Sequence, residues 1–343
     1  MLIAITPGDP EGVGPEIVCR TLLSRSPEIP RDVRLLCVGA AEPFRRLGAT
    51  LVEVRELRDA ASLPRTGAGE ILFLPAPTAA ETLKPKGPKS RRFSLPGYQS
   101  GWAIERATRL VRAGLADALV TGPISKERLQ AGGYPFPGHT EMLARLCGKK
   151  DVTMMLANDQ LRITLVTTHL ALKDVSRAVT AREITRAVRH TVDSLRDWWG
   201  IARPRVAVCA LNPHAGENGL FGREEIRVII PTLARLRRHY GTNATLLGPL
   251  PADTLFANHA ALPPGQRPDA VVCMYHDQGL IPVKLLDFPR TVNVTLGLPI
   301  VRTSVDHGVA FDIAGTGKAD PSSFQSALRL ACRIARTRKE NLR

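Results

Sequence analysis

The sequence VVCMYHDQG, residues 271–279, decides the fold class of this chain. Its first five residues are apolar or aromatic and uncharged, and the run is too short for a helix, so it predicts a buried parallel strand. The strand ends where His276 and Asp277 begin. Ligands of open α/β sheets bind at the carboxyl ends of the strands, so His276 stands where a functional residue is expected.

Two further apolar strands end in the same way. Residues 161–168 lead into His169, and residues 206–213 lead into His214. A single histidine at such a place is more often an ordinary hydrogen-bonding loop residue. Three that follow separate strands can supply imidazole nitrogens to Zn²⁺, Co²⁺ or a similar ion and leave coordination positions open. We therefore predict a metal site at His169, His214 and His276.

The composition is that of a globular protein long enough for two domains. The chain has 343 residues, of which 44% are hydrophobic and 23% charged. Lys and Arg number 47 against 32 acidic residues, and the net charge of +15 favours anionic partners, although a solvated arginine-rich surface explains it equally well. Only 5% of residues are aromatic and the bases form no aromatic-lined platform, so small phosphates and carboxylates fit better than nucleic acid.

The cysteines and the N-terminus bear on the compartment of the protein, and the cysteines indicate a reducing one. None of the six cysteines belongs to a C-x-x-C pair, and at least three lie in apolar runs, where a reduced thiol behaves as a small hydrophobic group. The chain starts with a short apolar strand and no basic leader, and no apolar run approaches the length of a membrane span. We therefore predict a cytoplasmic protein without a membrane partner.

Strands and helices are expected to alternate along most of the chain. A strand at residues 2–6 precedes the glycine-rich turn at residues 7–16, and an amphipathic helix covers residues 182–199. The turn matches neither G-x-G-x-x-G nor the P-loop pattern. The alternation predicts the α/β class with a parallel sheet. Further strands are expected at residues 33–39, 70–74 and 116–121, and a further helix at 97–113.

Two polar residues, Thr140 and Asp253, allow more than one interpretation. Thr140 lies near a predicted helix start, where free N–H groups suit a phosphate or carboxylate and where a plain N-cap explains the residue equally well. Asp253 is either a helix cap or a group that supports a metal ligand or handles a proton. The basic, proline-rich segment at residues 84–92 is expected to be a solvated loop.

Along nearly its whole length the sequence resembles the 4-hydroxythreonine-4-phosphate dehydrogenase (PdxA) family of vitamin B6 biosynthesis. The likeness rests on the motifs ITPGDPEGVGPEI, PFPGHTEM, VTTHLAL, LNPHAGENG, GPLPADTLF, MYHDQGL and VNVTLGLPIVRTSVDHGVAFDIAGTGKADP. It implies that His169, His214 and His276 bind a divalent metal, with His276 contributed across a homodimer interface. It also implies that five residues contact the substrate: His139, Thr140, Lys284, Asn293 and Arg302.

A more distant likeness connects GDPEGVGPE and DHGVAFDIAGTGKADP to the isocitrate and isopropylmalate dehydrogenases. It implies a nicotinamide cofactor that is bound without a Rossmann fingerprint. The implied fold has two α/β/α domains with a cleft between them. The first is expected to comprise residues 1–127 and 269–343, and the second residues 128–268.

The resemblance implies a metal-dependent oxidoreductase that uses NAD or NADP. It would oxidise 4-phosphooxy-L-threonine to 2-amino-3-oxo-4-phosphooxybutanoate, which decarboxylates to 3-amino-2-oxopropyl phosphate. One divalent ion per site, zinc, magnesium or cobalt, would assist the oxidation. Lys284 and Asp253 are the candidate catalytic residues. Lys284 and Arg302 both suit an anionic group of the substrate, and either of them is a candidate to hold the phosphate.

Three alternatives fit the same residues. A paralogous dehydrogenase of the same fold would oxidise another phosphorylated hydroxy acid, such as a four-carbon sugar-acid phosphate, or a dihydrodiol carboxylate. A metal-dependent hydrolase would use three imidazoles and a metal-bound water. A basic nucleic-acid-binding protein would retain DNA or RNA in a salt-sensitive manner.

Overall fold

The computed structural model describes residues 1–24, 29–30, 32–57, 59, 62–78, 81 and 93–341, and the basic segment at 84–92 lies outside them. The chain divides into two compact units, residues 1–150 with 298–336 and residues 151–297 with 337–343. These limits differ from the predicted ones, 1–127 plus 269–343 and 128–268. Residues 269–297 fall in the second unit because strand β10 (Ala270–Cys273) pairs there with a strand on each side.

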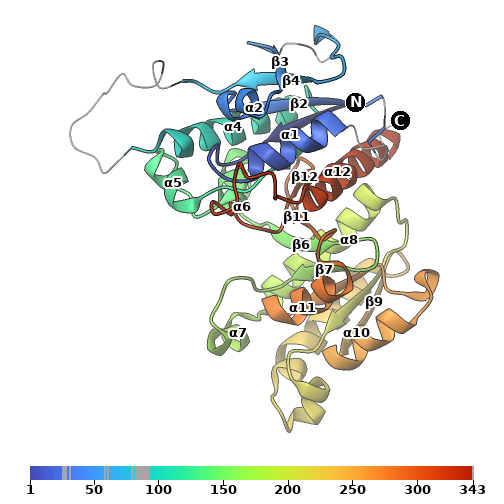
Figure 1. The fold of residues 1–343 in the computed structure, drawn as a ribbon. Helices are drawn as coiled ribbons and strands as arrows, with labels where there is room; N and C mark the ends of the chain where they lie inside the picture. The colour runs from blue at the N-terminus through green and yellow to red at the C-terminus, as the bar shows by residue number, and fades with distance from the viewer. Residues whose placement is uncertain are drawn as a thin grey trace. The chain divides into compact units, whose positions relative to one another are not determined.

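The first unit is built on a parallel sheet with the strand order β3-β4-β2-β1-β5-β12. Its strands are β1 (Leu2–Thr6), β2 (Arg34–Gly39), β3 (Thr50–Glu53), β4 (Glu70–Pro75), β5 (Ala118–Thr121) and β12 (Arg302–Ser304). Its helices are α1 (Gly14–Ser24), α2 (Glu42–Arg46), α4 (Leu95–Arg112), α5 (Lys126–Ala131), α6 (His139–Leu146) and most of α12 (Ser322–Asn341). Helix α4 runs along the sheet beside β1 and β2 (Figure 1). Because α5 and α6 pack on α4, residues 128–150 belong to this unit.

The second unit contains a mixed sheet with the strand order β11-β6-β7-β10-β8-β9. Its strands are β6 (Thr153–Ala157), β7 (Arg162–Leu165), β8 (Arg205–Cys209), β9 (Thr245–Leu250), β10 and β11 (Val292–Leu296). Its helices are α7 (Leu172–Ala178), α8 (Ala181–Trp199), α9 (Ile230–Tyr240), α10 (Ala252–Ala261) and α11 (His276–Asp287), with short helical turns η2 (Pro213–Gly219), η3 (Glu225–Ile229) and η4 (Pro264–Gln266).

The prediction of a parallel sheet is wrong for one edge of this second unit. Strand β6 is antiparallel to both β7 and β11, whereas β7, β10, β8 and β9 are parallel. The tight turn after β6 explains the reversal. The Asn158 side-chain oxygen accepts from the backbone N–H of Gln160 and of Leu161, both at 2.9 Å, and such a turn joins neighbouring antiparallel strands.

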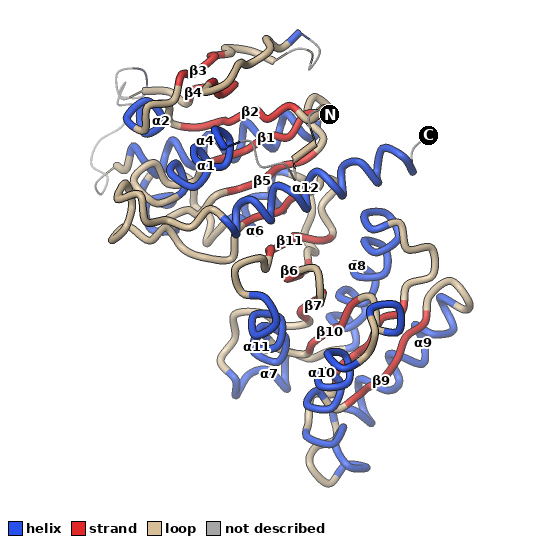
Figure 2. Tube along the Cα trace, turned by 45° about the vertical axis from the view of Figure 1, so that its right-hand side comes forward, coloured by secondary structure: helices blue, strands red, loops and turns tan. Residues whose placement is uncertain are grey.

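Strand β10 confirms the prediction from VVCMYHDQG, because all four of its residues are buried. Val272 packs in a cluster with apolar residues of α8 and α9, and Val271 and Cys273 pack in another with residues of α10 and α11. The helices of the two clusters flank the sheet in Figure 2. Helices on both faces explain why the strand is apolar throughout and does not alternate with polar residues.

The α/β class is confirmed, and the strands predicted at residues 2–6, 33–39, 70–74 and 116–121 and the helices predicted at 97–113 and 182–199 lie within two residues of the observed ones. Strands β7 and β8 end at Leu165 and Cys209, earlier than the predicted runs 161–168 and 206–213. All six cysteines are buried and unpaired. Within the part of the chain that the structure describes, no helix is both long enough and apolar enough to cross a membrane.

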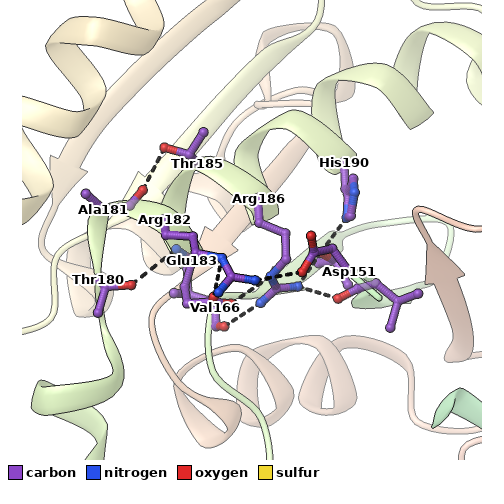
Figure 3. Close-up of polar contacts among 11 residues, drawn as sticks. Asp151, Val166, Thr180, Ala181, Arg182, Glu183, Thr185, Arg186 and His190 are labelled. Atoms are coloured by element: carbon purple, nitrogen blue, oxygen red, sulfur yellow. Dashed lines mark hydrogen bonds and ion pairs between the residues drawn. The ribbon is translucent and has the colours of Figure 1, made fainter. Parts of the chain in front are cut away.

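Hydrogen bonds from the Arg186 side chain join α8 to the segments of β6 and β7 (Figure 3). Its guanidinium donates to the backbone oxygen of Val152, to Oγ1 of Thr153 at 2.6 Å and to the backbone oxygen of Val166 at 2.9 Å. Glu183 pairs with the same guanidinium at 2.8 Å, and the Arg186 side chain is only 15% exposed. Arg186 therefore helps to hold the start of β6 and the end of β7 against α8, together with the hydrogen bond between His190 and Thr153.

We predict that Arg186→Met lowers the free energy of unfolding by about 3 kcal/mol, since it leaves several half-buried acceptors without a donor. Arg182→Met is the matched control. Arg182 lies one turn earlier and pairs with Asp151 at 3.0 Å, but it is 75% exposed, so its loss should cost less than about 1 kcal/mol. Urea unfolding followed by circular dichroism measures both, and equal losses would contradict the assignment.

Candidate active site

The predicted site residues occur in both units. The first unit contains His139, Thr140 and Arg302, and the second contains His169, His214, Asp253, His276, Lys284 and Asn293.

The neighbouring strands β7 and β10 bring two of the predicted metal ligands together. The ring centroids of His169 and His276 lie 5.5 Å apart in the same chain. Two imidazoles that bind one ion stand roughly 5–6 Å apart, given metal–nitrogen bonds of ~2.1 Å. His169 is exposed and His276 is partly exposed, so an ion has access from solvent. Within one chain the pair has the spacing of two ligands of one metal ion, whereas the resemblance implies that His276 is contributed across a homodimer interface.

Asp277 orients the imidazole of His276. Its Oδ1 lies 2.6 Å from Nδ1 of His276. A carboxylate on one ring nitrogen fixes the tautomer and leaves the other nitrogen, here Nε2, available as a ligand. This contact makes Asp277 a candidate for holding His276 in the orientation of a metal ligand.

His214 does not join this pair in a single chain. It begins a run of five residues, 214–218, whose φ angles are all positive, from 42° to 81°. Four of the five are not glycine, and the left-handed region costs such residues about 1–2 kcal/mol each. Among the described residues, no three His, Cys, Asp or Glu side chains form a group that could hold a metal ion. A three-imidazole site therefore needs a rearrangement of this turn or a second chain.

Glu225 anchors the turn that carries His214. It is buried at the start of η3, where the chain adopts a π-helical turn. Its Oε1 accepts from the backbone N–H of Leu211 and of Asn212, both at 2.8 Å, and its Oε2 accepts from the Asn212 side chain at 2.9 Å. No local pattern links position 225 to positions 211 and 212, so the sequence did not point to this residue.

Lys284, Asn293 and Asp253 occupy three different elements of the second unit. Nζ of Lys284, on α11, lies 5.4 Å from the ring centroid of Phe288. Asn293 is half-buried on β11. Asp253 is exposed in the first turn of α10. The interpretation of Asp253 as a helix cap is wrong, because Pro251 occupies the N-cap position and no side chain caps this helix.

Arg302 places a buried cation in the first unit. It begins β12, is 3% exposed, and donates from Nη2 to Oγ1 of Thr121 at 2.7 Å. Burial lowers the pKa of Arg302 to about 9, so the group is still charged at neutral pH. A buried charge is costly unless an opposite charge approaches it. Arg302 therefore suits the phosphate or carboxylate of an anionic ligand.

His139 adds a neutral imidazole to the same unit. Burial, and secondarily the charge of Arg302, hold the pKa of His139 well below its usual range. Its Nε2 is buried and has no hydrogen-bond partner among the described residues. An orphaned buried nitrogen fits a site that a ligand completes. Thr140 follows it as the second residue of α6, so the N-cap interpretation of Thr140 is wrong: Gly138 is the N-cap, and no side chain caps the helix.

We predict that His139 makes the protein less stable in acid. The depressed pKa keeps His139 unprotonated in the native state, whereas the unfolded chain takes up a proton below about pH 6.5. The free energy of unfolding of the wild type should therefore fall more steeply below pH 6.5 than that of His139→Gln, and the two should run parallel above pH 7. Urea titrations at pH 7.5, 6.0 and 5.0 measure this, and parallel curves throughout would refute it.

Comparisons with known proteins show which family the chain resembles. A family model described as pyridoxal phosphate biosynthetic protein PdxA matches residues 93–331. A 4-hydroxythreonine-4-phosphate dehydrogenase from Geobacter metallireducens is 46% identical, over 98% of this chain and 96% of its own. A relative from Bradyrhizobium diazoefficiens, provisionally named a D-threonate 4-phosphate dehydrogenase, is 44% identical, over 97% of this chain and 96% of its own. The crystal structure of a 4-hydroxythreonine-4-phosphate dehydrogenase from Klebsiella pneumoniae matches with a TM-score of 0.83 and 38% identity, over 97% of this chain and 99% of that one.

These similarities, with the two α/β units, place the chain among the α/β dehydrogenases. It belongs to the PdxA family, which confirms the resemblance seen in the sequence and makes it an enzyme of pyridoxal phosphate biosynthesis. In general terms, a dehydrogenase of this family implies a nicotinamide cofactor and a metal ion.

Proposed function

We propose that the chain is a 4-hydroxythreonine-4-phosphate dehydrogenase. It oxidises 4-phosphooxy-L-threonine with NAD or NADP to 2-amino-3-oxo-4-phosphooxybutanoate, which decarboxylates to 3-amino-2-oxopropyl phosphate. The observation that carries the proposal is the pair of imidazoles 5.5 Å apart at the strand ends of a chain 46% identical to a protein of that name.

We assign His169 and His276 as two ligands of the metal ion and His214 as the third. Imidazole ligands favour zinc or cobalt over magnesium, which prefers oxygen. When bound, the ion supplies Lewis-acid polarisation of a substrate oxygen. Asp277 keeps Nε2 of His276 directed to this role through its contact with Nδ1.

The substrate is an anion, and the charged residues of the chain suit it. We assign Arg302 to a carboxylate or phosphate of the substrate, because its guanidinium is buried and charged. Neutral His139 offers its buried Nε2 to a polar substrate group. Thr140, Asn293 and Lys284 are assigned as further substrate contacts. Lys284 and the exposed Asp253 remain the candidates for proton transfer.

We also propose that the protein works as a homodimer. Helix α11, which begins with His276, carries three exposed apolar side chains on one face: Ile281, Leu285 and Phe288. They follow the i, i+4, i+7 spacing of a helical stripe. Exposed apolar surface of this kind marks interaction sites. It supports an interface between two copies of the chain next to His276, the metal ligand that each copy contributes across that interface.

The dimer proposal predicts that Leu285→Glu yields monomers and loses most of the activity. A buried charge at an apolar interface is not compensated. Light scattering coupled to size-exclusion chromatography measures the mass. Leu47→Glu, which alters an exposed leucine of the first unit, should leave both the mass and the turnover unchanged. A dimeric, active Leu285→Glu protein would rule out α11 as the interface.

A paralogous activity is the second candidate. The relative from Bradyrhizobium diazoefficiens is 44% identical, nearly as similar as the first, and its provisional name gives D-threonate 4-phosphate as the substrate. The two substrates differ in an amino or a hydroxyl group at carbon 2. Both are phosphorylated hydroxy acids, so the same metal and anion-binding residues would serve either.

Turnover measurements decide between these candidates. The purified protein is supplied with Co²⁺, NAD or NADP, and either 4-phosphooxy-L-threonine, D-threonate 4-phosphate or a dihydrodiol carboxylate, and reduced cofactor is followed by its absorbance. We expect the highest kcat/KM with the first. His276→Ala should lower it by more than about 100-fold, whereas His239→Ala, at an exposed histidine of α9, should not. Phosphate release without cofactor reduction would instead indicate a hydrolase.

A further inference from the structure

Buried polar side chains join the three strand ends that lead to the histidines. Strands β7, β10 and β8 are neighbours in that order and are parallel, so His169, His276 and His214 leave the sheet from one edge. Beyond the last paired residues of these strands, backbone hydrogen bonds no longer fix the distance between the neighbouring segments. Side chains at these ends therefore control where the imidazoles stand.

The amide of Gln278 spans two of these ends. Gln278 is buried in the first turn of α11. Its Oε1 accepts from the backbone N–H of Met274 at 2.7 Å, and its Nε2 donates to the backbone oxygen of Ala210 at 2.7 Å. Met274 precedes His276 by two residues, and Ala210 precedes His214 by four. One side chain thus ties the end of β10 to the end of β8.

The hydroxyl of Thr167 ties the end of β7 to the same point. Thr167 is buried, lies two residues before His169, and donates from Oγ1 to the backbone oxygen of Met274 at 2.7 Å. The backbone N–H of Thr167 donates to that oxygen too, at 3.2 Å. Both polar backbone groups of Met274 are therefore held, its N–H by Gln278 and its oxygen by Thr167.

We propose that Gln278 and Thr167 are positioning residues of the metal site. They act through the backbone of Met274 and Ala210 and fix where each histidine leaves its strand, without touching the ion. The inference rests on the metal site proposed above. Metal sites tolerate errors of only about 0.5 Å in ligand placement, so a brace two residues from a ligand is felt as affinity.

Close packing of α11 keeps this brace within reach. A Cβ on Gly279, the next residue, would lie 2.8 Å from Sγ of Cys273 and 2.9 Å from Cδ1 of Ile163. A glycine there lets the helix start lie directly on β10 and β7. The Gln278 amide can then reach the Ala210 carbonyl of the next strand.

The test is a Co²⁺ titration of the metal-free full-length protein, without substrate or cofactor, for wild type, Gln278→Met and Thr167→Val. We expect both variants to bind Co²⁺ roughly 10–100-fold more weakly, the range found when groups that support metal ligands are removed. Gln278→Glu keeps the acceptor for the Met274 N–H and should be intermediate. Excess Co²⁺ should restore turnover to each variant, which a loss of folded protein would not allow.

Thr164→Val is the matched control. Thr164 is a buried threonine of β7, three residues before Thr167, and its hydroxyl pairs with that of Thr191 at 2.8 Å. The substitution removes a buried hydrogen bond of the same strand at a position farther from the histidines. We expect a lower melting temperature of the metal-free protein, comparable to that of Thr167→Val, with Co²⁺ affinity within about threefold of wild type.

Unchanged Co²⁺ affinity in Gln278→Met and Thr167→Val would overturn the inference, and so would an equal loss in Thr164→Val. A wild type that binds no Co²⁺ would overturn it as well. If the wild type and the variants bind Co²⁺ with the expected order of affinities but the wild type does not oxidise 4-phosphooxy-L-threonine, the proposed substrate is refuted. The positioning role is then still supported. The two failures are therefore distinguishable.

Discussion

The parallel pairing of β7, β10 and β8 is the constraint on which the second unit depends. Helices cover both faces of these strands, so their residues are mostly apolar, and except for the buried Thr164 of β7 the polar positions lie at their ends. Parallel register brings those ends to one edge of the sheet. The histidines occur there because that edge is where a buried sheet first meets solvent and ligands.

Buried polar groups do the remaining work at this edge. The Glu225 carboxylate holds the strained turn of His214, and the Gln278 amide and Thr167 hydroxyl hold the chain near His276 and His169. Each is satisfied by backbone groups of another strand or loop. A polar group that is buried and fully hydrogen-bonded specifies one arrangement, because any other arrangement leaves it unpaired.

The electrostatics of the first unit follow a different rule. Arg302 is buried with a hydroxyl partner, and burial together with the charge of Arg302 keeps the His139 imidazole neutral. A cation in that position is costly in the free protein and gains most from an anion. This is a physical basis for selecting a phosphorylated acid, which the net charge alone does not provide.

The sequence by itself determined the α/β class, most strands and helices, and the three strand-end histidines, because hydrophobic runs and the residues that end them are local signals. The motifs of the family supplied the predicted substrate contacts, which are His139, Thr140, Lys284, Asn293 and Arg302. The structure contradicted only the helix-cap interpretations of Thr140 and Asp253, since the N-caps are Gly138 and Pro251 and both residues lie in the first turn of their helices. It also showed units with other limits than the predicted domains, and a strand β6 that is antiparallel to its neighbours. Glu225, Gln278 and Thr167 were found only in the tertiary structure, because each has a partner 13 to 107 residues away and no local pattern records a contact between distant segments.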